Sequence, residues 1–183
     1  MPNAILDPTG RAPAAAPPAE GAPRAARRPD LTGARVGLLE NTKQNAALLL
    51  DELGKLLVAE HGAAGVTIMR TKQAFALPAP AELVAEYVQA CDVVITGVGD
   101  CGSCSASAVA DGVVFEAAGL PAAVICSDAF VTTADAMAQL RGAPGYAYVT
   151  TEHPVAVLTP EQVQERAEQV LPGVIALLTE KPA

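Results

Sequence analysis

The sequence contains no tryptophan, three tyrosines, three phenylalanines and two histidines in 183 residues. The core must therefore be built from aliphatic side chains, and a hydrophobic content of 51% is sufficient for one. Basic residues are also few, and a net charge of −8 argues against a nucleic-acid partner. No apolar run approaches the ~20 residues that a membrane-spanning helix needs. We therefore expect neither a nucleic acid nor a membrane among the partners.

Cysteine is scarce and unevenly placed. The four cysteines lie at positions 91, 101, 104 and 126, and none lies in the first thirty residues. Small secreted domains carry a spread-out framework of cysteines, which this chain lacks. The Arg27-Arg28 pair is followed by Pro29 and not by an apolar run, so it does not indicate a secretory signal. The pattern favours a cytoplasmic protein with one thiol site.

The first thirty residues lack aromatic side chains and hold seven of the fifteen prolines together with nine alanines. Such a stretch cannot bury enough apolar surface to fold alone, so residues 1–33 are predicted to form a mostly disordered tail. Residues 3–10 are an exception, because Ile5 and Leu6 precede a turn sequence and could dock on the body as a short extended segment. Residues 34–183 are expected to form one folded domain.

Short apolar runs alternate with amphipathic stretches from residue 34 onward. The expected strands are residues 35–39, 65–69, 92–96, 122–126 and 145–149, and the expected helices are residues 43–60, 80–90, 104–118, 131–140 and 160–178. Five successive β-then-α units imply a parallel sheet with helices on both faces. We predict a three-layer, doubly wound α/β fold with the flavodoxin-like strand order 2-1-3-4-5, which places a crevice between strands 1 and 3.

The most informative motif is Cys101-Gly102-Ser103-Cys104, which follows a buried strand at the start of a predicted helix. Two thiols three positions apart can close into a disulfide or lower one another's pKa. Unpaired N–H groups and the dipole at a helix start stabilise a thiolate, so we expect Cys101 to be the nucleophile. Cys104 lies one turn into the helix and is expected to resolve an adduct formed on Cys101.

The loops after the other strands bring further polar side chains to the same edge of the sheet. We expect Asp100 to bind loop N–H groups or move a substrate proton, Lys43 to pair with a thiolate or a substrate carboxylate, and His153 to donate a proton or bind a metal. Gly97 and Gly99 are expected to let the chain turn sharply and a substrate approach the backbone. The candidate substrate-binding residues are Asn41, Gly99, Gly102, Ser103, Ser105 and Cys126.

Residues 97–102 also fit the GxGxxG spacing of a dinucleotide site. The pattern is weak alone, follows the third strand, and places two thiols where a pyrophosphate would lie. We therefore expect no cofactor.

The motif sequences resemble the UGSC family. The resemblance is carried by GVGDCGSCS at residues 97–105, GLLENTKQNA at 37–46 and EHP at 152–154. The family takes its name from selenocysteine-Gly-Ser-Cys, and some members carry cysteine at the first position. Cys101 stands at the selenocysteine position and Cys104 at that of its partner thiol. The resemblance thus implies a redox or nucleophilic role for Cys101, while it does not define the reaction.

These observations favour a thiol-dependent redox enzyme, reductase or peroxidase-like, with a small-molecule substrate and a thioredoxin-type reductant as partner. The sequence is also compatible with a homo-oligomer. One alternative is a protein that binds zinc through Cys101, Cys104 and Cys126, with His153 as a further ligand. A second is a cofactor-independent racemase or lyase that uses Cys101 and Cys126 as acid and base, which would require a dimer. A third is a redox-sensing binding subunit.

Overall fold

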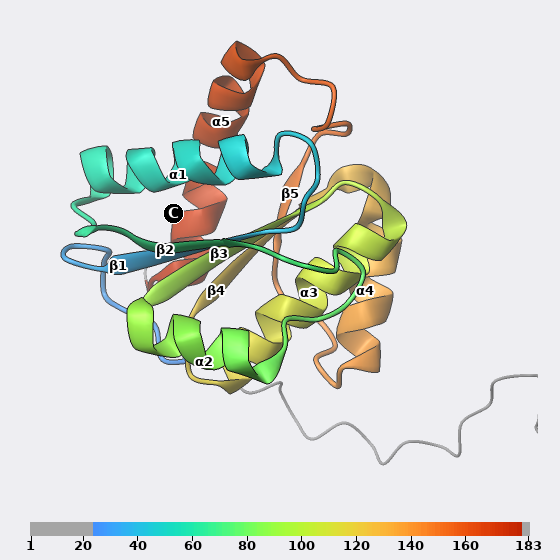
Figure 1. Ribbon diagram of the computed structural model, residues 1–183, viewed down its shortest axis with the longest axis horizontal. Helices are drawn as coiled ribbons and strands as arrows, with labels where there is room; N and C mark the ends of the chain where they lie inside the picture. Colours follow the sequence, from blue (N-terminus) through green and yellow to red (C-terminus); the bar gives the residue numbers. More distant parts are fainter. Residues whose placement is uncertain (1–23, 181–183) are drawn as a thin grey trace, which may run out of the picture.

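The computed structural model describes residues 24–180, and its five strands form one parallel sheet in the order β2-β1-β3-β4-β5 (Figure 1). The strands are β1 (Arg35–Glu40), β2 (Gly65–Thr71), β3 (Val93–Gly99), β4 (Ala122–Ser127) and β5 (Val149–Thr151). This is the flavodoxin-like order predicted from the sequence, so that prediction is confirmed. Residues 1–23 of the predicted tail, including the segment 3–10 expected to dock, lie outside the described residues.

Helices cover both faces of the sheet, which confirms the three-layer, doubly wound architecture (Figure 1). Helices α1 (Ala46–His61) and α5 (Pro160–Leu178) pack on one face, and α2 (Ala81–Ala90), α3 (Gly102–Ala117) and α4 (Val131–Leu140) on the other. A short 3-10 helix, Asp128–Phe130, precedes α4. None of the helices in the described range is long and apolar enough to cross a membrane.

The core is aliphatic, as the scarcity of aromatic residues requires. Buried Leu, Ile, Val and Ala side chains fill both interfaces between sheet and helices. Tyr87 and Phe115 are the two fully buried aromatic side chains among the described residues, with ring centroids 5.4 Å apart. Full burial of one such aliphatic or aromatic side chain contributes about 1.5–3 kcal/mol. These clusters hold the strand ends, and hence the loops after them, in fixed positions.

The first helix begins three residues later than expected, at Ala46. Thr42 and Asn45 adopt left-handed backbone conformations, with φ of 64° and 66°. The Asn45 side-chain amide donates to the carbonyl oxygens of Val155 and Leu158, at 3.0 and 2.9 Å. These long-range hydrogen bonds hold residues 42–45 as a turn and tie the loop after β1 to the loop after β5.

Strands β3 and β5 also differ from their expected bounds. β3 continues through Gly97 and Val98 to Gly99, and every residue of the strand is buried. β5 covers Val149–Thr151 and not residues 145–149. Gly145 has a φ of 75°, a left-handed conformation that interrupts an extended strand.

Residues 24–33, which the sequence analysis assigns to the tail, pack on the body. Ala25 and Leu31 are buried, and Leu31 belongs to the core beneath α1 and α5. The Arg27 guanidinium binds the buried Glu116 carboxylate at 2.6 Å, and the Ala25 N–H donates to the same group at 2.7 Å. The folded body of the structure therefore includes residues 24–33.

Candidate functional site

The two motif cysteines lie at the carboxyl edge of the sheet, where β3 passes into α3. Cys101 has an extended backbone and is the N-cap residue of α3. The Cys104 N–H donates to the Cys101 sulfur at 3.3 Å. A sulfur at this place faces the unpaired N–H groups and the positive end of the helix dipole, which favour a thiolate. The predicted local setting of Cys101 is therefore present.

Cys101 and Cys104 are joined by a disulfide, with Cα atoms 5.2 Å apart. Cys104 is 3% exposed, whereas Cys101 is partly exposed. The Ser103 hydroxyl lies 3.7 Å from the Cys101 sulfur. An incoming group therefore reaches the pair from the Cys101 side, while Cys104 is covered by the protein.

The Asp100 carboxylate, next to Cys101, is buried and collects hydrogen bonds from two loops. It accepts from the Ser127 hydroxyl at 2.5 Å, from the Val155 N–H at 3.2 Å and from the Ala156 N–H at 3.0 Å, and its Oδ1 lies 2.9 Å from His153 Nδ1. Burial raises the pKa of this carboxyl, but the hydrogen bonds outweigh burial and leave the pKa below its usual value. Asp100 is therefore a carboxylate at neutral pH.

His153 is brought to Asp100 by the loop after β5. Besides the contact between its Nδ1 and Asp100, its backbone N–H donates to Asp128 at 3.1 Å. Its ring meets the edge of Phe130 at a centroid distance of 5.3 Å, and 37% of its side chain is exposed. A carboxylate at Nδ1 favours the tautomer in which Nδ1 carries the proton, which leaves Nε2 able to accept one. Asp100 thus connects His153 to the motif, because its carboxylate is hydrogen-bonded to His153 and its backbone is followed directly by Cys101.

Asn41 and Lys43 both lie in the loop after β1, at the carboxyl edge of the sheet, but only the Asn41 side chain forms hydrogen bonds there. The Asn41 side chain is buried and bonds both backbone groups of Val98, donating to its carbonyl at 2.9 Å and accepting from its N–H at 3.1 Å. Asn41 therefore fixes the end of β3 against the loop after β1. The Lys43 side chain is partly buried and forms no hydrogen bond or ion pair with any residue between 24 and 180.

The glycines of the motif serve packing, which corrects the expectation that Gly97 and Gly99 form a sharp turn. Both lie inside β3, and neither has a positive φ. A Cβ on Gly99 would lie 2.7 Å from the Cys126 sulfur and 2.8 Å from the Cα of Ser105. A Cβ on Gly97 would lie 3.0 Å from a carbonyl oxygen of β4. Gly97 and Gly99 thus let β3 lie close to β4 and α3, whereas a Cβ on Gly102 would meet only Thr133 Oγ1, at 3.9 Å.

Ser105 and Cys126 lie in the interior beside Gly99 and not on the surface. Ser105 is buried and donates to the Gly99 carbonyl at 2.9 Å. Cys126 is fully buried opposite Gly99 in the register of β3 and β4. Burial raises the pKa of the Cys126 thiol to about 12, against a smaller opposing effect of a hydrogen bond with Ser105. Across residues 24–180, no group of three or more His, Cys, Asp or Glu side chains is arranged to hold a metal ion.

A buried ionic cluster that the sequence analysis did not identify joins Lys72 to two side chains of α3. Lys72 is 4% exposed, and its ammonium binds the Asp111 carboxylate at 2.5 Å and the Ser107 hydroxyl at 2.6 Å. Asp111 also accepts from the Ala79 N–H at 2.6 Å, so the cluster ties the loop after β2 to α3. A single lysine after an exposed strand carries no sequence signal that it will be buried.

Among solved structures the chain is similar to the flavodoxin-like domain of a Synechococcus sp. protein, with 18% identity and a TM-score of 0.36; the match covers 74% of this chain and 90% of that one. No curated protein matches the chain. The model of the UGSC family matches residues 4–180, nearly the whole chain, so the protein belongs to the UGSC family.

Proposed function

We propose that the protein is a thiol-dependent reductase in which Cys101 is the nucleophile and Cys104 the resolving thiol. The observation that carries this proposal is the disulfide between an N-cap cysteine that solvent reaches and a cysteine that is 3% exposed. An accessible sulfur at a helix N-terminus combines a lowered pKa with access for a substrate. A covered second sulfur then closes the pair without competing for the substrate.

The reaction begins with the Cys101 thiolate. Its attack on a substrate disulfide forms a mixed disulfide and expels one substrate thiolate, which takes up a proton. The Cys104 thiolate then attacks the Cys101 sulfur, forms the intramolecular disulfide and expels the second substrate thiol. The substrate gains two electrons and the protein loses two. A dithiol of the thioredoxin type, itself oxidised to a disulfide, restores the reduced pair.

A hydroperoxide can enter the same cycle. Attack of the Cys101 thiolate on the terminal oxygen breaks the O–O bond and gives a sulfenic acid and an alcohol, and Cys104 then displaces water to form the disulfide. Both substrates need a proton for the leaving group. His153, whose Nδ1 faces the Asp100 carboxylate, is suited to carry that proton on Nε2.

The cellular setting follows from the same chemistry. A dithiol that must be reduced again after each turnover suits the cytoplasm, where thioredoxin and glutathione keep thiols reduced. The scarcity of cysteine elsewhere in the chain agrees with that setting.

Single-turnover kinetics test the proposal. The reduced protein is mixed with a small disulfide or an alkyl hydroperoxide, and thiol loss is followed together with the mass of the products. The wild type is expected to consume one equivalent and end as the 101–104 disulfide. Cys101→Ser should be inert, and Cys104→Ser should stop at a mixed disulfide or sulfenic acid on Cys101.

The matched control is Cys91→Ala, which removes a buried thiol at the opposite end of β3. It should retain the wild-type rate. An unchanged rate in Cys101→Ser would contradict the assignment of the nucleophile. A reversible oxidation without turnover, even with a dithiol reductant present, would favour the redox-sensing subunit instead.

A further inference from the structure

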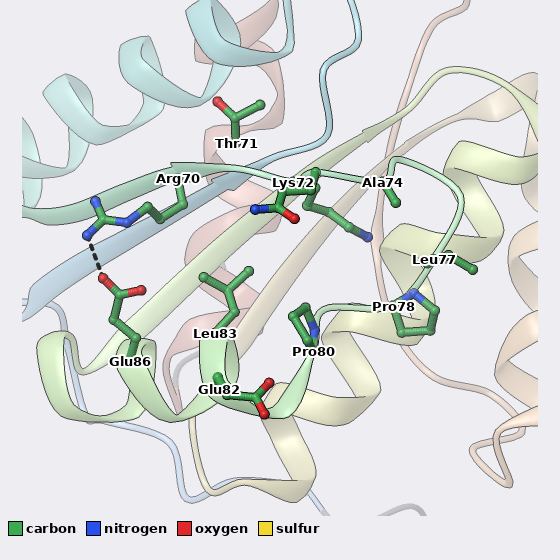
Figure 2. A pocket seen from close by; sticks show the side chains of 11 residues that line it. Arg70, Thr71, Lys72, Ala74, Leu77, Pro78, Pro80, Glu82, Leu83 and Glu86 are labelled. Atoms are coloured by element: carbon green, nitrogen blue, oxygen red, sulfur yellow. Dashed lines mark hydrogen bonds and ion pairs between the residues drawn. The ribbon is translucent and has the colours of Figure 1, made fainter.

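A pocket of about 520 Å³ opens beside β2, the edge strand of the sheet (Figure 2). Its walls are the end of β2, the loop over residues 72–80 and the first turns of α2. The apolar part of the lining is made by Ala74, Leu77, Pro78, Pro80 and Leu83, and Leu77 is 61% exposed. The pocket is therefore a mainly apolar hollow at the surface.

The basic side chains of the pocket are already paired. Arg70 binds Glu86 at 2.5 Å across the mouth, as the dashed line in Figure 2 marks. The Lys72 ammonium is bound to Asp111 behind the wall of the pocket. No described cation of the lining is thus left for an anionic ligand, and the lining favours aliphatic side chains.

The strand beside the pocket offers a backbone edge. Among the described strands, β2 pairs with β1 on one side and with none on the other. Edge strands present rows of N–H and C=O groups to which an extended segment can pair. An occupant that matches both features is an extended segment carrying one or two aliphatic residues.

The chain before residue 24 contains such a segment. Ile5 and Leu6 are the only leucine, isoleucine, valine or aromatic residues among residues 1–23. The family match begins at residue 4 and so includes this pair. In an extended segment neighbouring side chains point to opposite sides, so one of the two can enter a pocket while the other covers its rim.

The segment can also reach the pocket. The described chain begins beside Glu116, near the end of α3 that lies away from the disulfide. The loop that walls the pocket touches the same helix, because Ser107 donates to the Leu77 carbonyl at 2.8 Å. The path is thus on the order of the length of α3, ~24 Å. The seventeen residues 7–23 can span roughly 55 Å when extended.

We propose that residues 4–10 of this chain dock along β2, with Ile5 or Leu6 in the pocket. The inference goes beyond the proposed function and does not depend on it. Docking would cover Leu77 and hold the loop over residues 72–80 against α3, which carries the disulfide at its N-terminus.

Hydrogen exchange of the full-length oxidised protein tests the proposal. We expect amides within residues 70–83 to exchange about tenfold faster in the double variant Ile5→Asp/Leu6→Asp than in the wild type, because the paired segment is released. Leu77→Asp, on the pocket side, should produce the same increase. Ala14→Asp/Ala15→Asp places the same charges elsewhere in the terminal segment and should leave the exchange unchanged.

The outcomes separate the possible occupants. Equal exchange in the wild type and Ile5→Asp/Leu6→Asp would overturn the proposal, as would a change confined to residues outside 70–83. Protection of residues 70–83 that grows with protein concentration would identify a second copy as the occupant and would also overturn it. A melting temperature close to that of the wild type confirms that each variant is folded.

Discussion

Asp100 connects the chemistry of the site to the stability of its loops. Its buried carboxylate receives hydrogen bonds from β4 and from the loop after β5, and it directly precedes Cys101 in the chain. The sequence predicts that Asp100 binds N–H groups of its own loop or moves a substrate proton, whereas the structure gives it the N–H groups of Val155 and Ala156 in the loop after β5. The partner loop lies more than fifty residues away, so the neighbouring sequence could not identify it.

Asp100→Asn should destabilise the protein at neutral pH. The pKa of Asp100 is lowered in the folded state relative to about 3.9 in an unfolded chain. Its contribution to stability is therefore present above pH ~4 and is lost as the pH falls through the lower folded pKa. We expect the variant to lose about 1.5–3 kcal/mol at pH 7, because an amide replaces a charged acceptor. Urea unfolding between pH 7 and pH 3 measures this difference.

Asp51→Asn is the control, because Asp51 is an exposed member of a surface pair with Lys55. Its effect should stay within about 0.5 kcal/mol at every pH. The difference between Asp100→Asn and the wild type should shrink as the solution is acidified. A difference that is constant from pH 7 to pH 3 would show that the charge of Asp100 does not contribute.

At the scale of elements, the site depends on how closely β3 approaches its neighbours. The sequence identifies Gly97 and Gly99 but does not determine their role, because a GxG pattern is the same whether its glycines form a turn or allow close packing. Gly99 leaves room for the Cys126 sulfur and for the backbone of α3 at Ser105. This contact sets the distance between the end of β3 and the helix that carries the disulfide.

Substitution of the two motif glycines should have opposite results. A Cβ on Gly99 meets backbone at 2.8 Å, so Gly99→Ala is expected to cost about 1–3 kcal/mol through overpacking. In Gly102→Ala the nearest atom, Thr133 Oγ1, is 3.9 Å away, and the variant should be neutral or stabilising by up to about 1 kcal/mol in the first turn of α3. Chemical denaturation of both variants checks the contrast, and equal stabilities would contradict this packing account.

The overall topology followed from the sequence because five β-then-α repeats with turn residues between them allow few arrangements. Element bounds were predicted less well wherever a distant hydrogen bond decided them, as Asn45 does at the start of α1. The position of the thiols followed from strand and helix order alone. The contact between His153 and Asp100 and the burial of Lys72 required the folded structure, because neither depends on neighbouring sequence.

Across the described chain, burial separates the four cysteines into different chemical classes. Cys91 and Cys126 are buried, and burial raises the pKa of each to about 12. Cys104 is 3% exposed, whereas Cys101 is partly exposed at the N-terminus of α3. Thiolate chemistry at neutral pH is therefore expected at Cys101 before any other cysteine.

The pH dependence of alkylation of the reduced protein tests this claim most directly. Iodoacetamide labelling, mapped to each cysteine by mass spectrometry, reports the thiolate fraction site by site. The account predicts that Cys101 is labelled first and that its rate has a midpoint at least about one unit below 8.5, the pKa of a free thiol. A midpoint at or above 8.5, or labelling of Cys101 no faster than that of Cys91 and Cys126, would contradict it.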